Sequence, residues 1–548
     1  MGPNLLSADA GAMLEVQLDD ATATTHLSAW MAHVRSATAA LGWPAPSVQV
    51  DRDAASARCF FTAPVDQLMT ATEVAEQAWA AAEELGAMPL EQLRARARYA
   101  ANPQLVALRN AAVARRVLFT FDDESAALGS GAGVQVWPLD ALPAVAAIDW
   151  GAVHDIPVAL VTGSNGKTTT TRLIAAMLRA AGRVAGLSST DGVVIDDETV
   201  EAGDFSGPAG ARLVVRDPRV QVAVLETARG GILRRGLGVS RAAVAIVTNI
   251  AADHLGMYGI HDLTALAHVK LVTARALDAD GVLVLNADDA TLRAAAVDLR
   301  MPICWFSLRA DDPFVLAHIA AGGRAALLRE DELVLFQDGT AIELGSASTL
   351  PMAHAGAARH NIANALGAAA VATVLGVSVC TIRTALATFG THAGDNVGRL
   401  DIRRYRGITA IIDYAHNPAG ILALCDVARS LPAMRRLLVL GQAGDREDAA
   451  LAELARAAWS ALPFDRVIVK RMETLRRGRA VGATEAVLLA ALRAAGADER
   501  QLELADSELL AVQRAFIWAA PGDLLVLPVH AERAAVLQWL EEQFPDAG

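Results

Sequence analysis

A glycine-rich loop between an apolar strand and an amphipathic helix constrains the fold more than any other feature of the chain. Residues 158–161 are all apolar and predict the strand, and apolar residues recur at helical spacing after residue 167. In such a loop successive N–H groups converge beside a helix N-terminus, while a lysine supplies a cation and a hydroxyl can ligate Mg²⁺. The sequence therefore predicts a phosphate-binding loop, made of Gly163, Ser164, Asn165, Gly166, Lys167, Thr168 and Thr169. This loop is shorter than the general pattern of kinases and GTPases, because Val161 stands where they carry glycine.

The strand–loop–helix pattern repeats along the chain, with further apolar strands predicted at 220–225, 242–250 and 281–285. Continuous apolar strands alternating with helices predict an α/β fold whose sheet is mainly parallel and covered on both faces. The 548 residues favour about three domains. We expect an N-terminal α+β domain of uncertain role at 1–150, a central nucleotide-binding domain at 151–395, and a Rossmann-like α/β domain at 396–548.

Composition excludes several classes of function. The chain carries 48 Lys and Arg against 61 Asp and Glu, and this net charge of −13 argues against a nucleic-acid or anionic-membrane partner. Its four cysteines have no C-x-x-C spacing, which favours a reduced cytoplasmic setting. The uncharged stretch 361–379 contains Asn and Gly, so it predicts a buried helix rather than a membrane span. We expect a soluble cytoplasmic protein.

Polar side chains follow the predicted strands near their carboxyl ends. Glu226 directly follows the 220–225 strand, and Asn249, Asp253 and His254 lie near the end of the next one. In open α/β sheets ligands bind outside the carboxyl ends of the strands, at the edge that also carries the phosphate loop. We therefore expect Glu226, His254 and Lys167 to converge beside bound phosphates, where Mg²⁺ requires oxygen ligands.

Several motifs resemble one known family. The loop 163–169 resembles the Gly-Thr-Asn-Gly-Lys-Thr-Thr loop of the Mur ligases, which are ATP-dependent amide-forming enzymes that include the folylpolyglutamate synthases. Residues 225–234, 248–256, 412–420 and 444–448 resemble, in the same order, the Mur-ligase module of cyanophycin synthetases. The resemblance covers about 155 to 530. It implies a three-domain Mur-ligase-like fold with ATP and Mg²⁺ as cofactors.

The resemblance also implies roles for individual residues. Its catalytic set is Lys167, Glu226, His254, Lys270 and Arg399, and its metal-binding set is Thr168, Glu226 and His254. Besides the loop, the residues implied to bind ATP are Asn286, Asn361, Asn364, Arg399 and Asp413. The residues implied to contact substrate are Arg229, His416, Asp445 and Arg446. Lys270 lies near the position of a carbamylated lysine in Mur ligases, but a surface helix lysine fits the sequence equally well.

The implied reaction joins an amino acid, arginine-like by resemblance, to a peptide or amino-acid carboxylate through an acyl phosphate. Full cyanophycin synthetases also carry an ATP-grasp module, and only about 150 residues precede the loop here, so we expect a single ligation. The alternatives are a non-catalytic ATP-binding partner of a cyanophycin-type synthetase, a folylpolyglutamate-synthase-like ligase, and a kinase or NTPase. Expected partners are the amino acid and the carboxylate acceptor, with a homo-oligomer or association with a cyanophycin-type enzyme also possible.

Overall fold

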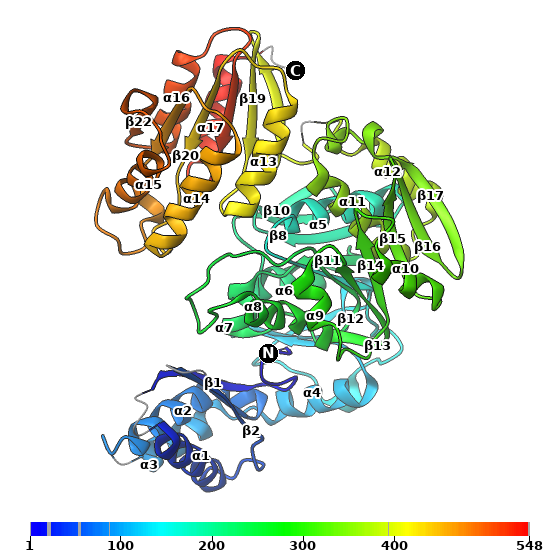
Figure 1. Ribbon diagram of the computed structural model, residues 1–548. Helices are drawn as coiled ribbons and strands as arrows, with labels where there is room; N and C mark the ends of the chain where they lie inside the picture. The colour runs from blue at the N-terminus through cyan, green and yellow to red at the C-terminus, as the bar shows by residue number, and fades with distance from the viewer. Residues whose placement is uncertain (1, 19–22, 53–55, 87, 393, 546–548) are drawn as a thin grey trace.

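The computed structural model describes residues 2–18, 23–52, 56–86, 88–392 and 394–545, which form three units that follow one another along the chain (Figure 1). The central unit contains an 11-stranded sheet in the order β10-β9-β8-β11-β7-β12-β13-β14-β15-β16-β17. Seven neighbouring strands from β8 to β15 run parallel, which confirms the predicted parallel sheet. They are β8 (Ala185–Ser189), β11 (Val222–Glu226), β7 (Val158–Thr162), β12 (Ala242–Val247), β13 (Leu277–Asn286), β14 (Ile303–Ser307) and β15 (Arg324–Arg329).

Antiparallel hairpin strands extend this sheet at both edges, a feature that the sequence reasoning did not include. They are β9 (Gly192–Ile195) and β10 (Glu198–Ala202) at one edge, and β16 (Glu332–Gln337) and β17 (Thr340–Ser346) at the other.

Helices cover both faces of the central sheet, as the continuous apolar strands predict. On one face the core includes residues of α5 (Lys167–Ala180), α11 (Arg359–Val374) and α12 (Val379–Thr388). The uncharged stretch forms most of α11, whose Ile362, Leu366 and Val371 are buried. No described helix is long and apolar enough to cross a membrane. The other face packs against α6 (Pro208–Arg216), α7 (Arg229–Arg235), α8 (Leu263–Lys270), α9 (Ala290–Ala295) and α10 (Pro313–Ala320).

The C-terminal unit is a second α/β layer structure. Its sheet has the order β18-β19-β23-β20-β21-β22, and only the β18–β19 pair is antiparallel. The strands are β18 (Asp401–Tyr405), β19 (Ile408–Asp413), β20 (Arg436–Leu440), β21 (Arg466–Lys470), β22 (Leu502–Ala505) and β23 (Leu524–Pro528). The helices α13 (Pro418–Ser430), α14 (Asp448–Ala461) and α15 (Ala483–Ala494) cover one face, and α16 (Glu508–Trp518) and α17 (Arg533–Gln543) cover the other.

The N-terminal unit has the expected α+β character. An antiparallel sheet of β1 (Gly11–Gln17), β2 (Val48–Arg52) and β3 (Ser56–Thr62) packs against α1 (Ala23–Ala40) and α2 (Leu68–Ala82). Helices α3 (Leu90–Ala100) and α4 (Pro103–Arg115) lead to a second small sheet of β4 (Phe119–Phe121), β5 (Ser125–Leu128) and β6 (Gln135–Pro138). Arg58 joins this unit to the central one, because its Nη2 donates to the Gly259 carbonyl at 3.0 Å.

The carboxyl ends of the parallel strands meet at one edge of the central sheet. The phosphate loop follows β7, Glu226 is the last residue of β11, and Asn286 is the last residue of β13. The β19–α13 connection and the N-terminal end of α13 lie beside this edge (Figure 1). The fold therefore places the phosphate loop, Glu226 and Asn286 at a cavity that the C-terminal unit also lines.

Candidate active site

The phosphate loop is held in shape by its neighbours. Gly163 and Gly166 have φ values of +148° and +82°, and a Cβ at either position would collide with Thr248 or Asn364. The Ser164 and Asn165 backbone N–H groups donate to the carbonyl and the side-chain oxygen of Asn249, each at 2.9 Å. These contacts fix the backbone of the loop directly ahead of the N-terminus of α5, which begins at Lys167.

Lys167 is the first residue of α5, and its ammonium group bends back over the loop. Its Nζ donates to the carbonyls of Gly163 and Ser164, both at 3.1 Å. This position leaves the cation beside the space that bound phosphates would fill.

A cavity of about 430 Å³ lies at this loop and is lined by both the central and the C-terminal unit. Most residues implied to bind ATP lie on its wall, together with several that the sequence reasoning named for other roles. The lining includes Ser164, Asn165, Gly166, Lys167, Thr168, Thr169, Glu226, Asn286, Asp288, Asn361, Asn364, Arg399, Asp413 and His416.

Three amide side chains at this cavity are fixed by hydrogen bonds. Asn361 Nδ2 donates to the Met352 carbonyl at 2.9 Å, and Asn364 Nδ2 donates to Asn361 Oδ1 at 3.2 Å. Asn286 Nδ2 donates to the Thr248 carbonyl at 3.0 Å. These contacts orient polar groups along the wall of the cavity.

Buried oxygen atoms gather around Glu226, which is only 1% exposed. The hydroxyls of Thr168 and Thr190 donate to its two carboxylate oxygens, each at 2.8 Å. Thr190 was not predicted. It directly follows β8 at the same sheet edge, and this place after a strand is the signal that could have identified it. Among the described residues no group of three or more His, Cys, Asp or Glu side chains could hold a metal. One carboxylate and one hydroxyl still fit Mg²⁺, which keeps several waters and binds substrate phosphates as well.

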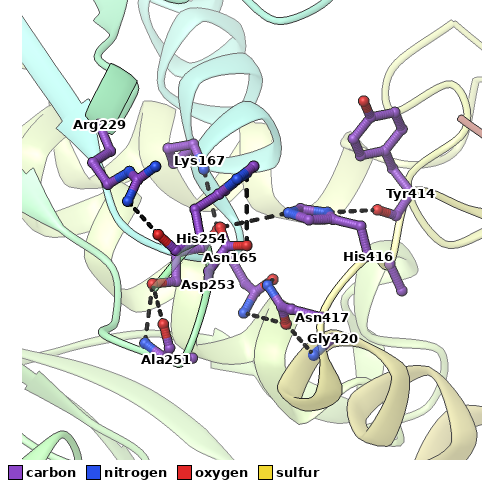
Figure 2. Close-up of polar contacts among 12 residues, drawn as sticks. Asn165, Lys167, Arg229, Ala251, Asp253, His254, Tyr414, His416, Asn417 and Gly420 are labelled. Carbon is purple, nitrogen blue, oxygen red and sulfur yellow. Dashed lines mark hydrogen bonds and ion pairs between the residues drawn. The ribbon is translucent and has the colours of Figure 1, made fainter. Parts of the chain in front are cut away.

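His254 lies in a different group of side chains, which crosses from the central to the C-terminal unit. The Asp253 side chain is 12% exposed, and its carboxylate is 2.7 Å from Arg446 Nη2 and 3.6 Å from His416 Nε2. Figure 2 shows His416 pointing toward Asp253 and His254 from the C-terminal side. His254 Nε2 is 3.1 Å from the same Arg446 nitrogen, and its Nδ1 is 3.7 Å from Asp445.

The electrostatics of this second group keep His254 neutral. Burial and the charges of Arg446 and Arg229 outweigh the attraction of Asp253 and lower the pKa of His254 to about 4. Arg229 also fixes the loop, because its Nη1 donates to the His254 carbonyl at 2.5 Å. His254, Arg446 and His416 line a hollow of about 210 Å³ beside the main cavity. The predicted substrate residues Arg229, His416, Asp445 and Arg446 therefore gather around His254.

Lys270 ends α8 and lies beneath the phosphate loop. It is 3% exposed, and its Nζ donates to the Gly163 carbonyl at 2.8 Å. The interpretation as a surface helix lysine is therefore wrong. Burial, together with the charge of Lys167, lowers the pKa of Lys270 to about 7. Its amine is consequently half neutral near neutral pH.

The hinge between the two units is the segment 394–400, which leads into β18 and carries Arg399, the remaining predicted cation. Arg399 stacks over the Tyr414 ring at 4.3 Å and lies 3.7 Å from the Asp191 carboxylate. Asp413 accepts hydrogen bonds from the backbone N–H groups of Leu400 and Ala415, each at 2.7 Å. This carboxylate therefore fixes the chain near Arg399 and at the start of the β19–α13 connection.

The fold and the site define an α/β protein with a phosphate loop, whose main cavity is completed by a second α/β unit. Residues 161–372 match the family model for the Mur ligase middle domain, and residues 398–528 match that for the Mur ligase glutamate ligase domain. The chain belongs to the Mur ligase family, whose members are ATP-dependent amide-bond ligases.

Curated relatives include two cyanophycin synthetases. The Synechocystis enzyme is 42% identical over 334 residues, which cover 61% of this chain and 38% of that protein. The Trichormus variabilis enzyme is 39% identical over 383 residues, which cover 70% and 42%. The chain thus spans about two fifths of the length of these relatives.

A UDP-N-acetylmuramate–L-alanine ligase of Acidithiobacillus ferrooxidans is 29% identical over 390 residues, covering 69% of this chain and 75% of that one. Among solved structures, the Mycobacterium tuberculosis folylpolyglutamate synthase complexed with ADP and AMPPCP aligns with a TM-score of 0.53 at 22% identity. That alignment covers 70% of this chain and 91% of that one, and it shows a shared fold.

Proposed function

We propose that this protein is an ATP-dependent ligase that joins an amino acid to a carboxylate acceptor through an acyl phosphate. The observation that carries the proposal is the composition of the main cavity. Its wall unites the phosphate loop and Glu226 of the central unit with Arg399 and Asp413 of the C-terminal unit. A nucleotide bound to the loop would therefore place its terminal phosphate among fixed cations.

The residues of this cavity suit both steps of the reaction. A carboxylate attacks the γ-phosphorus of ATP and releases ADP, and the amine of the amino acid then displaces phosphate from the acyl phosphate. Negative charge develops on phosphoryl oxygens in the first step and on the carbonyl oxygen in the second. Lys167 and Arg399 supply positive charge to the developing anions. Thr168 and Glu226 would hold Mg²⁺, which supplies further charge neutralisation at the phosphates when bound.

The C-terminal unit serves to exclude water from the acyl phosphate. It meets the phosphate loop through a reciprocal amide pair, in which Asn417 Nδ2 donates to Asn165 Oδ1 at 3.0 Å and Asn165 Nδ2 donates to Asn417 Oδ1 at 3.2 Å. Asn417 also caps α13 by accepting from the Gly420 N–H at 2.9 Å (Figure 2). The start of this helix is thereby tied to the loop that binds phosphate.

The amino acid in this proposal is arginine-like. Support comes from the similarity to cyanophycin synthetases and from the group around His254, where Asp445 and Asp253 lie among Arg229, Arg446 and His416. Carboxylates and guanidinium groups beside one hollow can recognise both charges of an amino acid. The metal role proposed for His254 would require its ring to leave Arg446, which it now contacts at 3.1 Å.

The carbamate proposed for Lys270 has a clear test. A neutral buried amine can react with CO₂, and the pKa of about 7 keeps much of Lys270 neutral at pH 7.5. We expect Lys270→Ala to lose most of its turnover and to recover part of it in added acetate or formate, because these carboxylates can replace the carbamate. A Lys270→Ala enzyme with unchanged turnover and magnesium dependence would exclude the carbamate.

The proposed function is tested by mass spectrometry of the products formed from ATP, the twenty amino acids and aspartyl or glutamyl peptides. We expect one amino acid to be added per acceptor carboxylate, with phosphate release that requires both substrates. The matched control is Lys167→Ala, which should form no product. Phosphate release without any acceptor would indicate an NTPase. If no acceptor stimulates release and Lys167→Ala behaves like the wild type in cells, the protein is a non-catalytic partner.

A further inference from the structure

The turn Thr190-Asp191 joins the oxygen cluster at Glu226 to the hinge of the C-terminal unit. It connects β8 to β9 and so lies at the carboxyl edge of the central sheet. Thr190 Oγ1 donates to Glu226, while the next side chain, Asp191, contacts three arginines from three different segments. One short turn therefore touches both sides of the candidate site.

Asp191 is the shared partner of Arg172, Arg399 and Arg533. Its Oδ2 accepts from Arg172 Nη2 at 2.8 Å, and its Oδ1 accepts from Arg533 Nη1 at 2.5 Å and lies 3.7 Å from Arg399 Nη2. Burial alone would raise the pKa of Asp191, but the charges of the three arginines outweigh it and lower this pKa. Three guanidinium groups surround this carboxylate, and the charge of Glu226 also acts on Arg172.

The same cluster fastens the hinge. Arg172 belongs to α5 and Arg533 begins α17, and both donate to the Val397 carbonyl. The next residue, Gly398, has a φ of +63°, and a Cβ there would lie 2.6 Å from Arg533 Nε. The chain therefore passes close to Arg533 immediately before Arg399.

Two nitrogen atoms of the Arg399 side chain, Nε and Nη2, are buried and have no hydrogen-bond partner among the described residues, although the side chain lines the main cavity. Buried donors without partners are costly, so such an arrangement indicates an acceptor that is supplied by a ligand. The ion pair with Asp191 and the stacking on Tyr414 fix the guanidinium while its donors remain available.

We propose that Asp191 is a positioning residue, which holds Arg399 toward the transferring phosphoryl group and fastens the C-terminal unit through Arg533. The inference rests on the proposed function, because it assigns to Arg399 the stabilisation of the negative charge that develops during phosphoryl transfer. Neither Asp191 nor Arg533 is needed to touch the nucleotide in this arrangement. Asp191 acts through Arg399, and that dependence can be measured.

The variant Asp191→Asn keeps the size of the side chain and removes its charge. We expect kcat for amino-acid-dependent phosphate release to fall by about tenfold to a hundredfold, as for other misplaced catalytic groups, with little change in KM for ATP. In an Arg399→Ala background the same change should have a much smaller effect, because only the contact with Arg533 remains to be lost. Asp197→Asn, which removes an exposed acid of the neighbouring hairpin, is the matched control and should behave like the wild type.

A binding measurement tests the role of Asp191 without requiring the protein to ligate an amino acid. ADP with aluminium fluoride mimics the transferring phosphoryl group, and Asp191→Asn should bind it at least about tenfold more weakly while binding ADP alone as the wild type does. Wild-type kcat and binding in Asp191→Asn would overturn the inference, as would equal losses in the wild-type and Arg399→Ala backgrounds. If Asp191→Asn does not fold, Asp191→Glu carries the same comparison, with the charge displaced by one methylene group. The wild type could bind this mimic more tightly than Asp191→Asn does and still ligate no amino acid. That result would contradict only the proposed function.

Discussion

At the scale of single residues, Lys270 shows most clearly how the fold changes a side chain. An ordinary lysine holds its proton up to a pH of about 10.5, but burial beneath the phosphate loop lowers the pKa of Lys270 to about 7. Between these two values the unfolded chain binds a proton that the folded chain has released. The free energy of unfolding attributable to Lys270 must therefore rise with pH across this window, by up to about 1.4 kcal/mol per pH unit.

We predict that this pH dependence is lost in Lys270→Met. Urea unfolding of both proteins, followed by circular dichroism from pH 7.5 to 9.5 in CO₂-free buffer, gives the difference in their stabilities. That difference should shift with pH in favour of the wild type, since the other ionisable groups are common to both chains. A difference that stays constant with pH would mean that Lys270 keeps an ordinary pKa.

At the scale of elements, a buried ion pair ties β21 to α16 in the C-terminal unit. Lys470 Nζ donates to Glu508 and to the Pro528 carbonyl, and both charged side chains have no exposed surface. Glu508 also accepts from the backbone N–H groups of His530 and Glu532, at 2.7 and 2.6 Å. The pair thus fixes the end of β21 against the segment that follows β23.

We predict that Lys470→Ala destabilises the C-terminal unit by about 3–5 kcal/mol, because Glu508 would remain buried without its partner. Hydrogen exchange in β21 and β23 at constant pH reports this unit separately and should show a large loss of protection. The neighbouring Arg471→Ala is the control. It removes an ion pair with the 72%-exposed Asp506 side chain and should cost at most about 1 kcal/mol. Equal losses in the two variants would show that Glu508 without its partner is no more costly than the exposed Asp506 without its own.

The elements also show which part of the fold the sequence can predict. The parallel strands are continuous apolar runs buried on both faces, and this property can be recognised without knowing their neighbours. The β16–β17 hairpin was missed although Asp338-Gly339, with φ values of 51° and 74°, is a common hairpin turn. The Asp-Gly pair between two apolar runs is therefore a sequence signal that predicts this hairpin.

The candidate site divides in the same way. The phosphate loop and Glu226 are set by a strand and the residues that end it, so local patterns predict where they lie. Contacts such as Asp191 with Arg533 and Asp253 with Arg446 join residues far apart in the chain. They depend on how the C-terminal unit is oriented on the central one, which no local pattern encodes. The buried position of Lys270 could not be predicted either, because it depends on how α8 packs beneath a loop that lies 107 residues earlier in the chain.

At the scale of the whole molecule, polar contacts join the C-terminal unit to the central one around the cavity. They include the Asn165–Asn417 amide pair, the Asp191 cluster, and the contacts of Asp253 with Arg446 and His416. Polar interfaces within one chain resemble those of transient complexes, so domain motion is the expected behaviour. Asp253 is well suited to control this motion, because its carboxylate, in the central unit, contacts both Arg446 and His416 of the C-terminal unit.

We predict that Asp253→Asn loosens the ligand-free molecule without unfolding either unit. The amide cannot balance the charge of the buried Arg446, so the contact that holds the loop 444–448 against the central unit becomes unfavourable. Small-angle X-ray scattering should then give a larger radius of gyration than the wild type, while circular dichroism stays unchanged. An ATP analogue with Mg²⁺ should reduce the difference, because the nucleotide would contact both units at once. Asp280→Asn, an exposed acid of β13, should match the wild type. An Asp253→Asn molecule as compact as the wild type would show that the remaining contacts suffice to hold the two units together.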